Sequence, residues 1–237
     1  YDIQDSYPEV TFIVFKNDTT TGEYINAMAD ECYTDYFLIV RSDMEIIAFE
    51  SKPLLEIMKS KDHPVAISPV MLSSSGEIMP TLRAPYIRGK EVDPQSFQPD
   101  IESDSCQPTL YPVLCLGLYD RALLQRLRGY DVDILGEYYQ SLDLGVRSWL
   151  FGYKMFTTRN LAVRFPNRVS VIEDRSECSG MDRFYTKALS IKRVSGKNMV
   201  SKWKPYVDKK VLSEEVKKKQ VNLQKTDFFT LIEKWGE

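Results

Sequence analysis

The sequence predicts an α/β fold in which helices flank a mainly parallel sheet, with a helical extension at the C-terminus. Three observations lead to this expectation. Short β-rich apolar runs alternate with stretches of helical spacing along residues 9–170. One strand, helix and strand lie within roughly 30 residues, the length of a βαβ unit whose strands are parallel. From residue 195 onward the chain is Lys-rich, with ten Lys against six Asp or Glu.

The expected βαβ unit occupies the first 40 residues. EVTFIVF, residues 9–15, is typical of a buried strand. Thr and Asp capping candidates precede a helix expected over 22–32, in which apolar residues recur at helical spacing. Residues 36–40 then form the second strand. The right-handed crossover rule makes 9–15 and 36–40 adjacent parallel strands, with the helix packed on the sheet.

The rest of the chain predicts further elements around one long irregular loop, residues 73–112. A loop of this length inside a compact domain is usually functional or disordered. In chain order we expect a helix over 52–62 with Pro53 in its first turn, a strand in PVAISPVML, a strand and helix in VLCLGLYDRALLQRLRGYD, a helix in EYYQSLDLGVRSWLFGYK ended by Gly152, and strands in MFTTRNLAVRF and VSVIED. This gives one α/β domain over 1–194 and a Lys-rich helical extension over 195–237.

Composition excludes several classes of function. A net charge of −3 and a pI near 5.5 give no support to nucleic-acid binding. No apolar run approaches the roughly 20 residues that span a bilayer. The cysteines have no Cys-x-x-Cys spacing, which favours reduced thiols and a cytoplasmic location. The Lys-rich extension is either a solvated helical surface or a contact with a membrane surface or a partner protein.

The first candidate site lies where strand 36–40 runs into the charged stretch 41–45. Ligands bind at the carboxyl ends of strands in open α/β sheets, so Arg41, Asp43 and Glu45 are candidates to contact one. The alternative is that the strand reaches the surface there and a turn begins, with Arg41 paired to Asp43.

Three segments in order resemble a nucleotide-sugar glycosyltransferase of the GT-A fold, family-2 type. NDTTTGEYINAMADECYTDYFLIVRSDMEI resembles the family's run from an Asn to a strand that ends in Asp-x-Asp. LCLGLYDRALLQRLRGYD resembles the acceptor-side segment, and EYYQSLDLGVRSWLFGYKM resembles the helix written ED-x-DL-x-x-R-x-x-x-x-Gly-Tyr. The matching residues are Asn17, Gly22, Asn26, Ala27, Asp143, Leu144, Arg147, Gly152 and Tyr153.

The resemblance implies a hexosyltransferase-type enzyme that transfers a sugar from a nucleotide-sugar donor to a glycan or other acceptor hydroxyl with inversion. It implies that Arg41, Asp43, Asn26 and Arg147 contact substrate. It also implies a Mn²⁺ or Mg²⁺ site formed by the Asp-x-Asp carboxylates, for which Asp43 and Glu45 are the candidates here. The family's first strands and helices, which hold the nucleotide base, are expected to precede EVTFIVF, and only eight residues do.

The sequence departs from the family's pattern at three chemical positions. Arg41 replaces the first Asp of Asp-x-Asp, so metal dependence should be weak or absent. Gln140 and Ser141 stand where the helix motif has a Glu and the Asp that acts as the catalytic base. This leaves Glu137 or Asp143 as substitute catalytic groups. Arg164 or Phe165 stands where a His often follows. The alternative function is therefore a catalytically silent pseudo-glycosyltransferase that binds a glycan or scaffolds a partner.

Overall fold

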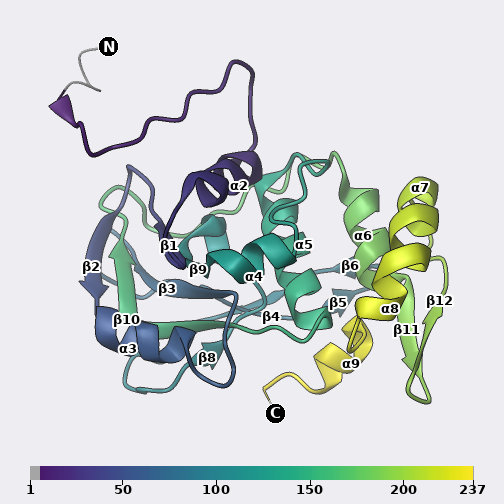
Figure 1. Ribbon diagram of the computed structural model, residues 1–237. Helices are drawn as coiled ribbons and strands as arrows, with labels where there is room; N and C mark the ends of the chain where they lie inside the picture. Colours follow the sequence, from purple (N-terminus) through teal and green to yellow (C-terminus); the bar gives the residue numbers. More distant parts are fainter. Residues whose placement is uncertain (1–5, 237) are drawn as a thin grey trace.

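The computed structural model describes residues 6–236, built around a six-stranded sheet (Figure 1). The strands are β1 (Tyr36–Ile39), β2 (Glu45–Phe49), β3 (Ala66–Leu72), β8 (Gln107–Pro108), β9 (Gly117–Asp120) and β10 (Met155–Arg164). Five of them lie in the order β1, β9, β3, β10, β2, and β8 pairs with β10 beside this path. The expected strands in PVAISPVML and MFTTRNLAVRF are confirmed as β3 and β10.

The sheet is mixed, so the expectation of a mainly parallel sheet is wrong. Only β3 and β10 pair in parallel, whereas β9 pairs antiparallel with both β1 and β3, and β2 pairs antiparallel with β10. The apolar pattern of a strand does not specify the direction of its neighbour, and β9 inserts between β1 and β3. It follows from these pairings that β1, β3 and β10 point the same way, so their carboxyl ends lie along one edge of the sheet.

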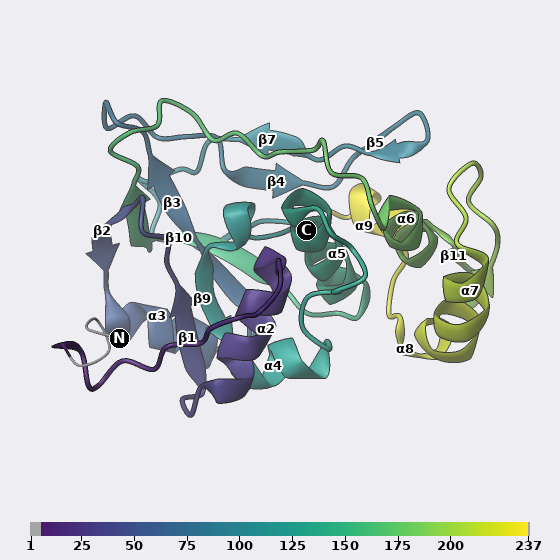
Figure 2. The same ribbon diagram turned by 90° about the horizontal axis from the view of Figure 1, so that it is seen from above.

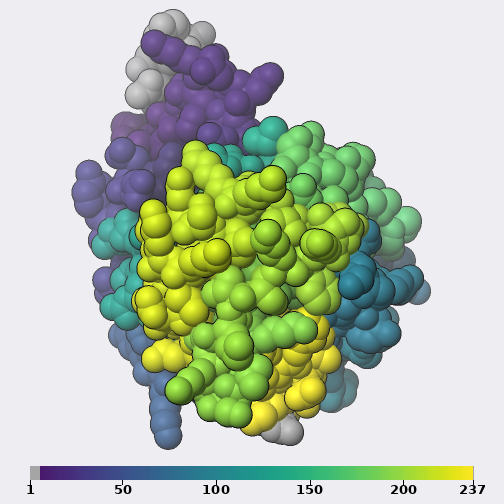
Figure 3. Space-filling view, turned by 90° about the vertical axis from the view of Figure 1, so that its right-hand side faces the viewer, coloured from purple at the N-terminus to yellow at the C-terminus, as the bar shows by residue number. Residues whose placement is uncertain are grey.

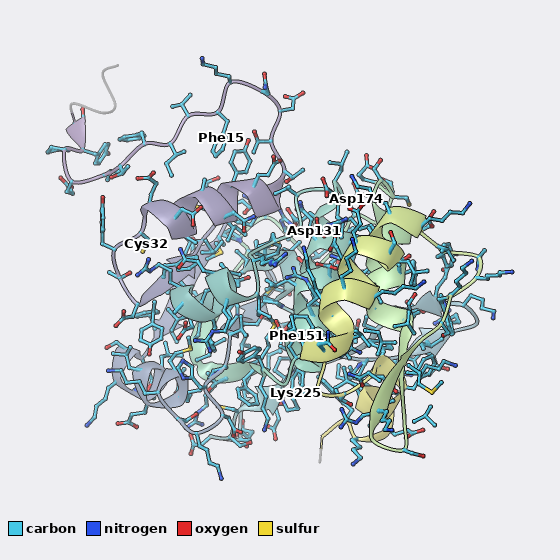
Figure 4. The ribbon with its side chains drawn as sticks, turned by 45° about the vertical axis from the view of Figure 1, so that its right-hand side comes forward. Phe15, Cys32, Asp131, Phe151, Asp174 and Lys225 are labelled. Carbon is cyan, nitrogen blue, oxygen red and sulfur yellow. The ribbon has the colours of Figure 1, made fainter. Side chains whose placement is uncertain are left out.

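The expected βαβ unit is also wrong, because residues 9–15 form no strand. Val14 is 87% exposed. The ring of Phe15 makes an edge contact with the ring of Tyr24 in the helix that follows, with 4.9 Å between the ring centroids (Figure 4). The helix that follows is confirmed as α2 (Thr21–Glu31), which begins with a capping box between Thr20 and Glu23. Among the described residues β1 pairs only with β9, so its other edge has no strand neighbour.

Helices cover both faces of the sheet (Figures 1 and 2). They are α3 (Ser51–Met58), α4 (Arg121–Arg126), α5 (Glu137–Leu150) and α6 (Met181–Leu189), in addition to α2. Leu118 packs in a small core with Leu54 of α3, while its neighbour Tyr119 lies in the large core with α2 and α5. Successive residues of a strand face opposite sides, so the large core and the small core lie on opposite faces.

Helix α5 lies almost entirely inside the protein. A Cβ at Gly145 would lie 2.2 Å from the carbonyl oxygen of Leu110, so only glycine permits this close approach. The helix ends at its C-cap, Phe151, and the next residue, Gly152, has a φ of +86°. This left-handed conformation is the one expected of a glycine after a helix end.

The expected loop 73–112 contains two small antiparallel sheets. They pair β4 (Leu82–Ala84) with β7 (Gln95–Phe97), and β5 (Ile87–Arg88) with β6 (Glu91–Val92). A 3₁₀ turn, η1 (Val113–Cys115), follows. The strand expected in VSVIED, residues 169–174, is absent, and this segment has no regular secondary structure.

The C-terminal part of the chain covers one end of the molecule (Figure 3). It contains the hairpin β11 (Ile191–Val194) and β12 (Lys197–Val200), then α7 (Lys209–Val211), the π-helix η2 (Leu212–Gln220), α8 (Val221–Leu223) and α9 (Phe228–Glu233). Residue 195, where we expect the extension to begin, lies in the turn of the hairpin. Phe228 of α9 belongs to the large core. No helix within residues 6–236 combines the length and apolar content of a membrane span.

Candidate functional site

Loops that follow the carboxyl ends of β1, β3 and β10 meet at one edge of the sheet. Asp43, beyond β1, forms an ion pair with Arg168, beyond β10. Ser74, beyond β3, donates its backbone N–H to the carbonyl oxygen of Arg168 at 2.7 Å. The strand directions therefore gather these side chains where ligands bind in α/β sheets.

A chain of alternating charges crosses this edge. Nε of Arg41 lies 3.2 Å from Oδ1 of Asp43, and Arg168 contacts the other oxygen of the same carboxylate. On its other side Arg41 lies 3.9 Å from Oε2 of Glu137, which accepts a hydrogen bond from Oγ1 of Thr21 at 2.7 Å. The four charged side chains are each about a third exposed. They form the charged edge, defined here as Arg41, Asp43, Glu137 and Arg168.

Asp43 is the anion at the centre of this arrangement. Partial burial acts to raise its pKa, but hydrogen bonds and charge from Arg168 and Arg41 outweigh burial and lower the pKa below its usual range. Asp43 therefore remains an anion that orders the two guanidinium groups at neutral pH.

Glu137 reaches the charged edge because α2 and α5 are joined at their N-termini. The buried side chain of Gln140 accepts from the N–H of Gly22 at 3.0 Å and donates to Oγ1 of Thr20 at 2.9 Å. A Cβ at Gly22 would lie 2.9 Å from Oε1 of Gln140 on α5 and 2.6 Å from Cβ of Tyr130, so glycine permits this close approach of α2 to α5 and to the loop before it. Gln140, which stands at an acidic position of the family motif, has a structural role here.

The sequence resemblance aligns Ser141 with the Asp that acts as the catalytic base. Ser141 lies in the interior rather than at the charged edge. Its Oγ is 3.0 Å from Sγ of Cys115, and both residues are buried. Burial is the main cause that raises the pKa of Cys115 to about 12, with the charge of Glu137 adding to it. The pair is therefore a neutral contact inside the core.

Asp143 and Arg147 are not brought to the charged edge either. Both are buried in one ionic network, in which Nε of Arg147 lies 2.7 Å from Asp143 and Lys187 contacts the other oxygen of Asp143. Lys187 also lies 2.5 Å from Asp131, which Arg183 approaches to 2.7 Å. Figure 4 shows Asp131 beside the helices of the C-terminal part.

Asn26, predicted to contact substrate, binds the chain itself. Its side chain donates to the carbonyl oxygen of Tyr130 at 2.9 Å and accepts from the N–H of Tyr130 at 2.8 Å. The neighbouring Gly129 has a φ of +63°, and a Cβ there would lie 2.2 Å from Oδ1 of Asn26. Asn26 thus fixes the turn before α5.

The donor set at the strand end does not fit a divalent cation. Both oxygens of Asp43 face guanidinium groups, and Glu45 pairs across β2 and β10 with Arg164, at 2.5 Å. A hard cation needs several oxygen ligands that are free to coordinate it. Within residues 6–236 no three His, Cys, Asp or Glu side chains are grouped as metal ligands.

Two contributors to the charged edge, Arg168 and Thr21, were not predicted. Arg168 stands four residues past the end of β10, and the only signal for it is that β1 and β10 end at the same edge. The directions of β1 and β10 have to be known before this signal can be used, and the sequence does not give them. Thr21 follows the expected cap, and its contact depends on the packing of α2 against α5.

No protein-family model and no curated protein matches the sequence. Among solved structures, the chain is similar to a crystal structure of GalNAc-T7 with UDP, GalNAc and Mn²⁺, with a TM-score of 0.68 and 14% sequence identity. The similarity covers 99% of this chain and 47% of that one, so this chain spans about half the length of its neighbour. At this identity the likeness concerns the fold alone. The chain has a GT-A-like fold.

Proposed function

We propose that the protein is a glycosyltransferase whose nucleotide-sugar donor binds with its diphosphate at the charged edge. The observation that supports this most is the placement of Arg41 and Arg168 beyond the carboxyl ends of β1 and β10 in a GT-A-like fold. Guanidinium groups bind phosphate oxygens with paired, charge-assisted hydrogen bonds.

In this proposal Arg41 and Arg168 stabilise the leaving diphosphate. Asp43 holds both side chains in place before the donor arrives. When the bond between the sugar and the diphosphate breaks, negative charge grows on the leaving oxygen, and the two cations lie where they can offset it. This assigns to arginine the charge compensation that a metal ion would otherwise supply.

Glu137 is the group proposed to act as the general base. It accepts the proton of the acceptor hydroxyl, whose oxygen forms the new bond to the anomeric carbon as the diphosphate departs. One displacement of this kind inverts the anomeric configuration. Glu137 is supported by its position, since it is the carboxylate of α5 that reaches the charged edge and remains partly exposed.

Calorimetric titration with UDP, the nucleotide bound in the GalNAc-T7 structure, tests the donor site. We expect UDP to bind with or without Mn²⁺, and we expect Arg41→Gln and Arg168→Gln each to weaken binding at least tenfold. That factor corresponds to about 1.4 kcal/mol, close to the lower end of the range for one hydrogen bond to a charged group. Arg164→Gln is the matched control, because Arg164 pairs with Glu45 on β2. Binding that neither Arg41 nor Arg168 affects would place the donor elsewhere.

A second function, a binding protein without turnover, is favoured by one observation. Ser141 is buried against Cys115, so the position of the family's base carries no carboxylate. A pseudo-glycosyltransferase of this kind would bind UDP as described and release no sugar from a nucleotide-sugar donor. Donor hydrolysis measured beside UDP binding separates the two functions.

A further inference from the structure

The hairpin β11–β12 presents an outward face on which apolar and basic side chains alternate. Its register places Lys192 opposite Met199, and Val194 opposite Lys197. All four side chains are exposed, Val194 by 51% and Met199 by 58%. Ile191 faces the other way, into a small core formed with α7 and η2. Two ammonium groups and two apolar side chains therefore share one solvent-facing surface.

Trp203 connects this hairpin face to a basic hollow. Nζ of Lys192 lies 6.0 Å and Nζ of Lys90 lies 5.1 Å from the centre of the Trp203 ring, so both cations lie over one aromatic side chain. Lys90 belongs to the hollow, which measures about 540 Å³. Its lining consists of Lys90, Lys202, Lys204, Pro205, Val207 and Lys209.

The lysines of this surface have no salt-bridge partners among the described residues. Six lysines lie on it, and none forms an ion pair with any residue in 6–236: Lys90, Lys192, Lys197, Lys202, Lys204 and Lys209. The chain as a whole is acidic, with a net charge of −3. A local excess of cations on an acidic protein is complementary to an anionic surface.

We propose that this lysine–apolar face binds an anionic phospholipid membrane. The hairpin extends from the body of the protein, so Val194 and Met199 can enter the headgroup region together (Figure 1). Tryptophan and lysine stems suit the boundary between water and acyl chains. The hollow beside Trp203 is lined by four lysines together with Pro205 and Val207, a residue set that suits the phosphate of a lipid headgroup.

A membrane fits this face better than an acidic segment of a partner protein. The apolar residues lie on a protruding two-stranded tip rather than along a groove that could hold a peptide. The apolar side chains would lower the binding free energy by insertion among lipids, and the lysines by attraction to anionic headgroups. A lipid surface offers both an apolar interior and negative charge. This inference does not depend on the proposed transferase activity.

Co-sedimentation of the full chain with vesicles tests the proposal. We expect binding to vesicles that contain phosphatidylserine, weakening as salt is added, and little binding to phosphatidylcholine alone. The triple change Lys192→Gln, Lys197→Gln and Lys202→Gln should lower the partition coefficient roughly a hundredfold, about fivefold for each ammonium group removed. The double change Val194→Ser and Met199→Ser should lower it independently, with the charge unchanged.

Matched controls separate this face from general charge and apolarity. Lys52→Gln, Lys59→Gln and Lys61→Gln remove the same charge near α3, and Val169→Ser with Ile172→Ser removes exposed apolar groups elsewhere. Both controls should bind vesicles like the wild type. Equal losses in controls and test variants would overturn the proposal, as would tight binding of inorganic phosphate or of an acidic peptide by a protein that no vesicle retains.

Discussion

Arg41 and Arg168 both contact Asp43 just beyond the end of β1. With Arg41 on one oxygen of Asp43 and Arg168 on the other, the end of β1 offers two cations around one anion. In the proposed function these two cations attract the diphosphate of the donor directly.

Metal dependence should be weak or absent. Because both oxygens of Asp43 are engaged by guanidinium groups, Mn²⁺ has to displace ion pairs to bind there. Calorimetric titration of Mn²⁺ with and without UDP measures this. Tight binding of Mn²⁺ to the protein alone, abolished by Asp43→Ala, would contradict it.

Glu137→Gln should lower turnover by about 10²–10⁴, the usual contribution of a general base. Ser141→Ala should change turnover little, because Ser141 contacts Cys115 in the interior. Glu45→Gln is the control carboxylate, since Glu45 pairs with Arg164. Sugar transfer, with the anomeric configuration of the product read by NMR, is the measurement. Turnover unaffected by Glu137→Gln would place the base elsewhere.

At the scale of elements, the buried ionic network ties α5 to α6 and to the loop after α4. Asp131 is the anion that Lys187 and Arg183 share. Burial acts to raise its pKa, but these two cations outweigh burial and hold the pKa well below the usual range of an aspartate. The loop and both helices therefore depend on an ionised Asp131.

Asp131→Asn should lower the free energy of unfolding at pH 7 by about 3 kcal/mol, the lower end for breaking a buried ion pair. Because the pKa is depressed in the folded state, this contribution is present above roughly pH 4, near the unfolded pKa of aspartate. It is lost as the pH falls through the folded pKa.

Urea unfolding of both proteins at pH 7 and pH 3 tests this. The difference in stability between wild type and variant should shrink at the lower pH. Asp100→Asn, at an exposed aspartate of the long loop, is the control. A difference that is the same at both pH values would exclude Asp131 as the titrating group.

At the scale of the whole molecule, the α/β class and most helices were predictable because they depend on local pattern. Thr and Asp capping candidates indicated the start of α2, where Thr20 is the cap, and Gly152 indicated the end of α5. Strand pairing was not predictable, because it depends on residues far apart. Nothing in residues 117–120 shows that β9 lies between β1 and β3.

The candidate site likewise contains residues that the sequence predicted correctly and residues that it did not. Arg41, Asp43 and Glu137 were predicted and lie together, because the first two follow the end of β1 and the third begins α5. A motif predicted substrate contacts or catalysis for Asn26, Asp143 and Arg147. Their side chains instead form hydrogen bonds with backbone groups and a buried ion pair. A motif specifies residue types but not which of them face the solvent.

The bare edge of β1 has a consequence for behaviour at high concentration. Among the described residues no strand covers that edge, and the extended apolar segment 9–15 lies exposed rather than in a sheet. An open edge offers unpaired N–H and C=O groups to any extended chain, and an apolar segment of β-forming residues is a suitable partner. Any self-association of this chain through that edge should depend on the apolar side chains of the segment. Ile13→Lys or Val14→Lys should therefore lower the light scattering of concentrated solutions, and equal scattering by the wild type and both variants would contradict this.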